Sequence, residues 1–284
     1  MVRDTIKINE NSSNSWFEIS PERGGIVTSL GLGGQELLYF NKETFLDIYS
    51  NIRGGMPILF PICDRLKNNF YTIDDKPYSM KNHGFARNFA WSIKERNIEE
   101  SSIILTLKSN NVSRKQYPFE FELTFKYLLL NGEFIIYQSY KNLSDKPMPF
   151  YSGFHPYFKT SMKQLSVYND AKCFYDVQKK EVFSFKGELD LRGRNEALFL
   201  LDSKNRETRF PISSTESIQL TYGDEFKYVT FWSECNKEYL CVEPWMALPD
   251  SLNTKRDLQC LAKGETLNTF IKVRIINNEI NPIK

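Results

Sequence analysis

Alternation of apolar and polar residues along the chain predicts β-strands, and the clearest case is a hairpin. In the segment FEFELTFKYLLL, residues 119–130, apolar and polar positions alternate over most of the length. Asn131 and Gly132 then supply a two-residue turn that tolerates positive φ, and the alternation resumes in EFIIYQSYKN, residues 133–142. This pattern predicts two antiparallel strands joined by a tight turn.

The same signal recurs along the chain and predicts an all-β fold. Four further segments are rich in β-branched or aromatic residues and bounded by polar turns, namely residues 101–109, 227–233, 238–244 and 269–276. We find no long amphipathic helix, internal repeat or low-complexity linker. We therefore expect a single domain, residues 1–284, built as a large antiparallel β-sandwich or barrel rather than a parallel α/β sheet.

One glycine-rich segment, GLGGQE at residues 31–36, superficially resembles a dinucleotide-binding loop. Its third glycine falls one position early, and LLYF at residues 37–40 predicts a strand. A phosphate cradle needs the N-terminus of a following helix, which supplies free N–H groups and a favourable dipole. We therefore interpret the segment as a hairpin turn.

Charge and composition narrow the class of partner. The 37 basic and 35 acidic residues give a formal charge of +2, and no run of like charges could follow a phosphate backbone, so nucleic acid is not expected as a partner. No segment has the apolar length of a signal peptide or a membrane span, which predicts a cytoplasmic protein that does not bind membranes.

The five cysteines are odd in number and scattered, without a C-x-x-C pair or the spacing of zinc ligands. This predicts reduced thiols, with Cys241 buried inside an apolar strand as the plainest example.

Both histidines of the chain lie in unusual contexts. His155 in GFHPYF precedes a proline and is flanked by aromatic residues, while His83 in KNHGFAR is followed four residues later by Arg87. Imidazole can give and take a proton near neutrality, so both histidines are candidates for catalysis or binding. The alternatives are a core histidine satisfied by one hydrogen bond for His155, and a polar loop whose Arg87 pairs with a surface carboxylate.

Two charged residues adjoin apolar segments. Arg65 ends NIRGGMPILFPICDRL, residues 51–66 less one, and burying an unpaired guanidinium is costly, so we expect it to face a carboxylate or a polar ligand. Glu243 follows YLCV, and strand alternation directs it to the face opposite Val242. It is either a structural ion-pair partner, with Arg65 or Arg87, or a general base opposite a histidine acid.

Taken together, GGMPILFPICDRL, NHGFARNFAW, YSGFHPYF and CVEPWMALPDSLN resemble, in order and spacing, the galactose mutarotase-like superfamily of aldose 1-epimerases, particularly its shorter bacterial branch. The resemblance spans residues 51–253. It implies an antiparallel β-sandwich, the galactose mutarotase-like supersandwich, whose concave sheet holds a monosaccharide. It also implies an isomerase of carbohydrate metabolism that interconverts the α and β anomers of a hexose.

The resemblance assigns roles to individual residues. Glu243 resembles the general base for the anomeric hydroxyl, and His155 resembles the acid that protonates the ring oxygen. His83 and Arg65 resemble groups that bind and orient the sugar. Only protons move in this reaction, so neither a metal nor a nucleotide cofactor is implied.

The resemblance leaves the substrate open. HGFAR also resembles a branch acting on hexose 6-phosphates, in which arginines clamp the phosphate, so Arg87 is a further substrate-binding candidate and the partner is a monosaccharide or a sugar phosphate. The family's additional sugar-contacting aspartate has three candidates, Asp176, Asp190 and Asp202, and Asp64 could pair with Arg65.

Other classes of function remain open, together with the oligomeric state. A non-catalytic sugar-binding or sensing protein on the same fold is the alternative to an enzyme, since the fold alone does not fix the function. A glycosidase or lyase has less support, because no second carboxylate is strongly placed. The chain is expected to be a monomer or a homodimer.

Overall fold

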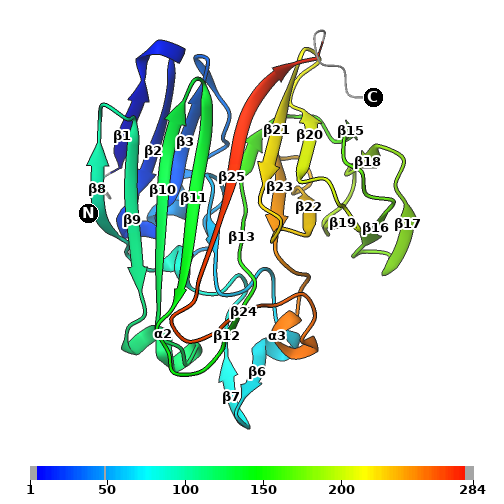
Figure 1. Cartoon of the computed structure of the whole chain (residues 1–284). Coiled ribbons are helices and arrows are strands. Elements are labelled where there is room, and N and C mark those ends of the chain that lie inside the picture. Colours follow the sequence, from blue (N-terminus) through cyan, green and yellow to red (C-terminus); the bar gives the residue numbers. More distant parts are fainter. Residues whose placement is uncertain (1–4, 48, 279–284) are drawn as a thin grey trace.

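The computed structural model describes residues 5–47 and 49–278, and it confirms a large antiparallel β-sandwich. Its two largest sheets form the body of the molecule (Figure 1). The seven-stranded sheet has the order β20 (Glu207–Pro211), β21 (Glu216–Tyr222), β25 (Thr266–Asn277), β11 (Glu133–Asn142), β10 (Phe121–Leu130), β9 (Ser102–Lys108) and β8 (Ser92–Asn97).

The eight-stranded sheet carries the residues of interest. Its order is β17 (Glu181–Ser184), β16 (Cys173–Asp176), β19 (Leu198–Leu201), β22 (Tyr228–Trp232), β23 (Tyr239–Trp245), β13 (Gly153–Phe154) and β5 (Ile58–Leu59), with β14 (Tyr157–Lys159) also paired to β23.

Smaller elements complete the described part of the chain. A four-stranded sheet has the order β1 (Ile6–Glu10), β2 (Ser15–Ser20), β3 (Ile26–Leu32) and β4 (Gln35–Glu36). Three strand pairs are β6 (Phe70–Ile73) with β7 (Lys76–Ser79), β12 (Met148–Phe150) with β24 (Gln259–Leu261), and β15 (Gln164–Ser166) with β18 (Glu188–Asp190). The helices are α1 (Lys42–Leu46), α2 (Asn111–Gln116) and α3 (Ser251–Thr254), and the 3-10 turns are η1 (Asn11–Ser13), η2 (Pro21–Arg23), η3 (Lys67–Asn69) and η4 (Ala86–Asn88).

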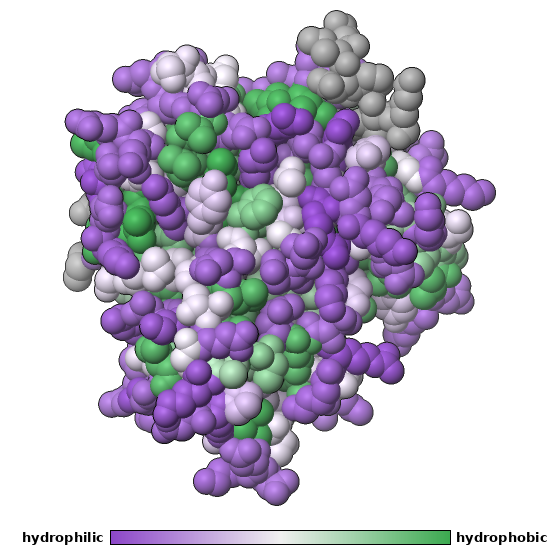
Figure 2. Space-filling view, in the orientation of Figure 1, coloured by the Kyte–Doolittle hydropathy of each residue, from purple (hydrophilic) through white to green (hydrophobic). Residues whose placement is uncertain are grey.

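The predicted hairpin is confirmed. Strands β10 and β11 pair in antiparallel register with Leu130 opposite Glu133, and buried side chains alternate with half-buried ones along β10. The four other predicted strands correspond to β9, β22, β23 and β25. Among the described residues all helices are short, as expected, and none is long and apolar enough to span a membrane. Figure 2 shows hydrophilic residues over most of one face of the molecule, with hydrophobic residues in small separate patches.

One predicted strand is wrong. The GLGGQE segment does form the hairpin turn between β3 and β4, but residues 37–40 make only isolated bridges. Leu38 bridges Phe158, whereas Phe40 bridges Gly54. Because these two positions pair with different segments, no continuous ladder forms along residues 37–40.

An aromatic core joins the two large sheets beneath the region of the histidines. The Phe60 ring lies 5.0 Å from that of Phe121 and 6.0 Å from that of Tyr140, measured between centroids, and both partners belong to the seven-stranded sheet. The Phe60 carbonyl accepts hydrogen bonds from the backbone N–H groups of Phe85 and Ala86. The NHGFAR segment is therefore fixed directly to the core.

Gly84 makes this attachment possible. Its φ is +68°, and a Cβ at this position would lie 2.2 Å from the Phe60 carbonyl oxygen. A side chain would force the NHGFAR segment away from the core, since the obstructing atom belongs to backbone.

We predict that Gly84→Ala destabilises the protein by about 2 kcal/mol more than Gly33→Ala, as measured by urea unfolding. Gly33 is a matched control because its φ of +58° is similar but a Cβ there would meet nothing within 4 Å. Its substitution should cost only the left-handed backbone penalty, about 1–2 kcal/mol. Equal losses in the two variants would contradict the steric explanation.

Candidate active site

Strand β23 presents the candidate base on one face. All seven of its residues are buried. Leu240 and Val242 belong to the main core, whereas Tyr239 and Cys241 pack in a separate cluster with Tyr157. Because side chains alternate along a strand, Glu243 lies on the same face as Cys241 and opposite Val242, as the sequence predicts.

The register of the sheet brings His155 to Glu243. Gly153 of β13 pairs with Trp245, and Tyr157 of β14 pairs with Cys241, so the intervening His155 falls opposite Glu243. His155 Nε2 lies 3.4 Å from Glu243 Oε1, and both side chains are buried. The backbone N–H of His155 donates to the Pro57 carbonyl, at 3.0 Å. We refer to these two side chains as the His–Glu pair.

Hydrogen bonding within the His–Glu pair is incomplete. His155 Nδ1 and Glu243 Oε2 are both buried without a hydrogen-bond partner among the described residues. His155 is therefore not a core histidine satisfied in the ordinary way. Buried polar atoms of this kind are rare in folded proteins and often mark a place where a ligand binds.

His83 faces the same region in a defined tautomer. Its backbone N–H donates to the Asp64 carbonyl at 2.7 Å, while the backbone N–H of Asp64 donates to His83 Nδ1 at 2.9 Å. Because Nδ1 accepts a hydrogen bond, the proton of the neutral ring resides on Nε2, which is then a donor. The ring is nearly perpendicular to that of His155, with 5.3 Å between centroids.

The two predicted arginines occupy different environments. Arg87 Nη2 donates to the Asn82 carbonyl at 2.9 Å and to Asn51 Oδ1 at 3.1 Å, both uncharged acceptors. Burial lowers the pKa of Arg87 to about 10. Arg65, by contrast, has a side chain that is 69% exposed and lies 3.4 Å from Asp64 Oδ1, the pairing that the sequence suggested. The structure thus groups Arg87 with the histidines and puts Arg65 at the solvent edge.

Sequence reasoning missed Arg53 as a member of this group. Its guanidinium lies 5.3 Å from the centroid of the Trp232 ring and 3.0 Å from a Glu234 carboxylate oxygen. The charge of Arg53 also lowers the pKa of His155. The residue stands directly before the Gly-Gly turn of the quoted segment, so its position beside a recognised motif was the available signal.

The three candidate aspartates do not supply the additional carboxylate near the His–Glu pair. Asp176 is bound by Arg194 at 2.6 Å, Asp190 by Arg192 at 2.7 Å, and Asp202 lies 3.6 Å from the Cys173 thiol. Asp64 is the carboxylate whose charge reaches the site, because it raises the pKa of Glu243.

Burial dominates the electrostatics of the pair. Desolvation raises the pKa of Glu243 well above its usual range, and Asp64 adds to this rise. Interactions with Trp245 and Arg87 oppose it, although the indole Nε1 of Trp245 has no complete hydrogen bond among the described residues. Desolvation, Arg87 and Arg53 lower the pKa of His155 to about 3. These opposite shifts favour a neutral pair that holds one proton.

His83 is also kept neutral. Desolvation lowers its pKa well below the ordinary histidine range, and the charge of Arg87 contributes in the same direction. The Nε2 donor of His83 is therefore present across the neutral range.

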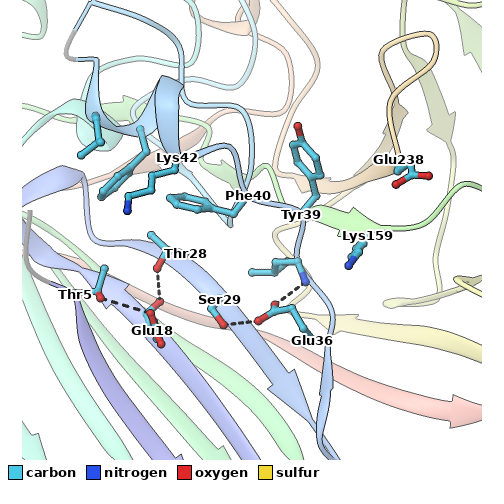
Figure 3. A pocket seen from close by; sticks show the side chains of 13 residues that line it. Thr5, Glu18, Thr28, Ser29, Glu36, Tyr39, Phe40, Lys42, Lys159 and Glu238 are labelled. Atoms are coloured by element: carbon cyan, nitrogen blue, oxygen red, sulfur yellow. Dashed lines mark hydrogen bonds between the residues drawn. The ribbon is translucent and has the colours of Figure 1, made fainter.

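A surface groove elsewhere does not provide comparable chemistry (Figure 3). It has a volume of about 660 Å³ and is lined by residues that include Glu18, Glu36 and Lys42. The Glu36 carboxylate accepts hydrogen bonds from the Ser29 hydroxyl and from the backbone N–H groups of Leu30 and Leu38. Since that carboxylate is already satisfied, the unsatisfied His–Glu pair is the better candidate for a reactive site.

Fold and site together define a sugar-epimerase type of β-sandwich, and comparison with known proteins identifies the family. A model of the aldose 1-epimerase family matches residues 11–273, and the chain belongs to this family. The chromosomal LacX protein of Lactococcus lactis subsp. lactis is 29% identical over 231 residues, which cover 70% of this chain and 76% of LacX.

Solved structures agree with this assignment. The Slr1438 protein from Synechocystis sp. PCC 6803 is 29% identical, with a TM-score of 0.93 over 97% of this chain and 96% of that one. A galactose mutarotase related enzyme from Lactobacillus acidophilus shares the fold at 22% identity, with a TM-score of 0.81 over 96% of this chain and 97% of that one.

Burial of Glu243 predicts a pH-dependent cost in stability. Because its pKa is raised in the folded state, the folded protein keeps a proton that the unfolded chain releases above about pH 4.3. As pH rises through this interval, the free energy of unfolding attributable to this group falls by up to about 1.4 kcal/mol per unit. Glu243→Gln removes the titration, so its stability relative to the wild type should increase with pH.

Urea unfolding between about pH 4 and pH 8 tests this expectation. Glu95→Gln, at an exposed position of β8, is the control for loss of a carboxylate without burial. A stability difference between Glu243→Gln and the wild type that stays constant with pH would contradict the burial argument.

Proposed function

We propose that the protein is a mutarotase, an aldose 1-epimerase that interconverts the α and β anomers of a hexose by general acid/base catalysis. The observation that carries the proposal is the buried contact of 3.4 Å between His155 Nε2 and Glu243 Oε1. In a cyclic aldose, the anomeric hydroxyl oxygen and the ring oxygen are bonded to the same carbon. An acid and a base that act on these two oxygens must therefore be close neighbours, as these side chains are.

The proposed mechanism needs one proton on the pair. Glu243 takes the proton of the anomeric hydroxyl while His155 gives a proton to the ring oxygen, and the bond between C1 and the ring oxygen breaks. The aldehyde then rotates about the C1–C2 bond. Closure on its other face reverses both transfers and restores the starting protonation. The opposite shifts of the two pKa values support this scheme, since they favour a pair that carries a single proton.

Neighbouring residues would hold the sugar in place. The Nε2–H of His83 is positioned to donate to a sugar hydroxyl, because its Nδ1 is already engaged by Asp64. Arg87 and the exposed Arg65 would donate to further oxygens of the substrate. Trp245, whose ring centroid lies 6.1 Å from that of His83, offers an apolar surface for the C–H face of the ring.

A hexose 6-phosphate is the second candidate substrate. Arg53 and Arg87 lie near enough that the charge of Arg53 lowers the pKa of Arg87. Two like charges held together in a partly buried setting favour an anionic ligand, and guanidinium groups bind phosphate with paired hydrogen bonds.

We expect the wild type to accelerate anomer exchange, followed by NMR for glucose, galactose and their 6-phosphates. Glu243→Gln and His155→Asn should each lower the accelerated rate by about 10²–10⁴-fold, since each removes one proton-transfer group. Glu95→Gln serves as the control, at an exposed strand position. Saturable sugar binding without accelerated exchange would instead indicate a sugar-binding protein.

The pH dependence of kcat/KM provides a separate test on metal-free protein in the presence of a chelator. The rate should follow a bell whose acidic limb reflects a second proton on the pair, and the lowered pKa of His155 places this limb below about pH 6.5. Loss of the single proton gives the alkaline limb, which the raised pKa of Glu243 moves well above the ordinary glutamate range. Residual activity of Glu243→Gln should lack the alkaline limb, and its persistence would exclude Glu243 as its origin.

A further inference from the structure

Cys241 lies beside the His–Glu pair rather than in the main core. The sequence predicted a buried thiol, and the residue is fully buried. It nevertheless packs with Tyr157 and Tyr239 in a small cluster separate from the main core. Two positions before Glu243 on β23, it shares the face of the strand that carries the proposed base.

Three metal-binding donor types converge at this point. One ligand atom from each of His155, Cys241 and Glu243 lies within 4.8 Å of the other two. In a tetrahedral zinc site with bonds of about 2.0–2.3 Å, the ligand atoms are about 3.3–3.8 Å apart. Closing the longest separation requires a movement of about 1 Å, which is within reach of side-chain rotation.

Two of these three residues carry donor atoms without a partner. His155 Nδ1 and Glu243 Oε2 lack hydrogen bonds among the described residues. Such atoms have already lost their hydration, so a ligand that satisfies them gains interaction energy at little further desolvation cost. A sugar hydroxyl can satisfy them, and so can a metal ion.

We propose that His155, Cys241 and Glu243 form a binding site for a thiophilic divalent metal ion of the zinc class, and that metal and sugar exclude each other. Thiolate, imidazole and carboxylate together suit Zn²⁺, Cd²⁺ and Co²⁺ better than Mg²⁺ or Ca²⁺, which prefer oxygen ligands alone. Binding releases the thiol proton to solvent, together with the proton held by the His–Glu pair. The bound ion then occupies both groups of the proposed acid/base pair.

Neighbouring charges set the expected strength of this site. The thiolate and the carboxylate together balance the charge of the ion, and Asp64 adds a further negative charge nearby. Arg53 and Arg87 act against a cation, since both oppose protonation of His155. We therefore expect reversible binding, weaker than at a structural zinc site and removable by a chelator.

Binding is tested first without reference to catalysis, by titrating Co²⁺ into chelator-treated full-length protein. The parent carries serine at the three less buried cysteines, Cys173, Cys235 and Cys260. One equivalent of Co²⁺ should produce a thiolate-to-cobalt charge-transfer band in the near ultraviolet. Cys241→Ser should remove the band, whereas Cys63→Ser, at the other buried thiol, should keep it.

The outcomes of this titration are decisive. No band in the parent at millimolar Co²⁺, or a band that persists in Cys241→Ser, would overturn the proposal. If the serine variant loses its near-ultraviolet circular dichroism, Cys241→Ala takes its place. Glu243→Gln retains the thiol and should keep the band while weakening Co²⁺ affinity by at least about tenfold, the usual effect of losing part of a metal site.

Inhibition forms the second test, and this part rests on the proposed function. Zn²⁺ should inhibit anomer exchange competitively with sugar, and chelator should reverse the inhibition. The inhibition constant should rise at least about tenfold in Cys241→Ser, relative to that variant's own uninhibited rate. A Co²⁺ band without any anomer exchange would retain the metal site and reject the mutarotase, whereas exchange insensitive to Zn²⁺ and no band would do the reverse.

Discussion

Burial of a carboxylate against an imidazole is the constraint on which this structure depends. Glu243 is 1% exposed and His155 is 7% exposed, and the two side chains lie opposite each other on adjoining strands. Desolvation disfavours the charged form of each group and so opposes an ion pair between them. What remains favourable is a pair that holds one proton, the protonation that an acid/base exchange between geminal oxygens requires. The reactive state therefore follows from burial, without a strong local charge.

The sheet makes that burial possible because it fixes both backbones. Strand β23 is paired on one side with β22 and on the other with β13 and β14, so Glu243 has little freedom to move toward solvent. His155 is held by its backbone hydrogen bond to Pro57. Below them, the aromatic core around Phe60 ties the NHGFAR segment to the seven-stranded sheet. Stability of the large sandwich thus offsets the cost of an unsatisfied polar site at one place.

The sequence predicts those features that depend on local pattern. Alternation located β10 and β11 and placed Glu243 opposite Val242, because the two-residue period is a property of one strand. It failed at residues 37–40, where a strand needs a neighbouring ladder that local pattern does not reveal. The NHGFAR and GFHPYF segments pointed to both histidines because each carries unusual residues in sequence.

Long-range geometry accounts for what sequence reasoning missed. The position of Arg53 over Trp232 joins segments far apart in the chain. Asp64 reaches His83 through backbone hydrogen bonds, which leave no signature in residue type. Cys241 looked like a core thiol because a buried cysteine in an apolar strand has the same local pattern on either face. Only the sheet register determined which face it occupies.

The same geometry creates a conflict of specificity within the site. Donor atoms left without partners are available to sugar oxygens, and for that reason they are also available to a metal ion. Satisfying them within the protein would remove the second possibility, but it would also remove the groups that the proposed reaction uses. Arg53 and Arg87 offer a physical resolution, because their charges disfavour a cation and favour the oxygens of a sugar or a phosphate. Their positive field thus acts on selectivity at the same place where burial sets the protonation of the His–Glu pair.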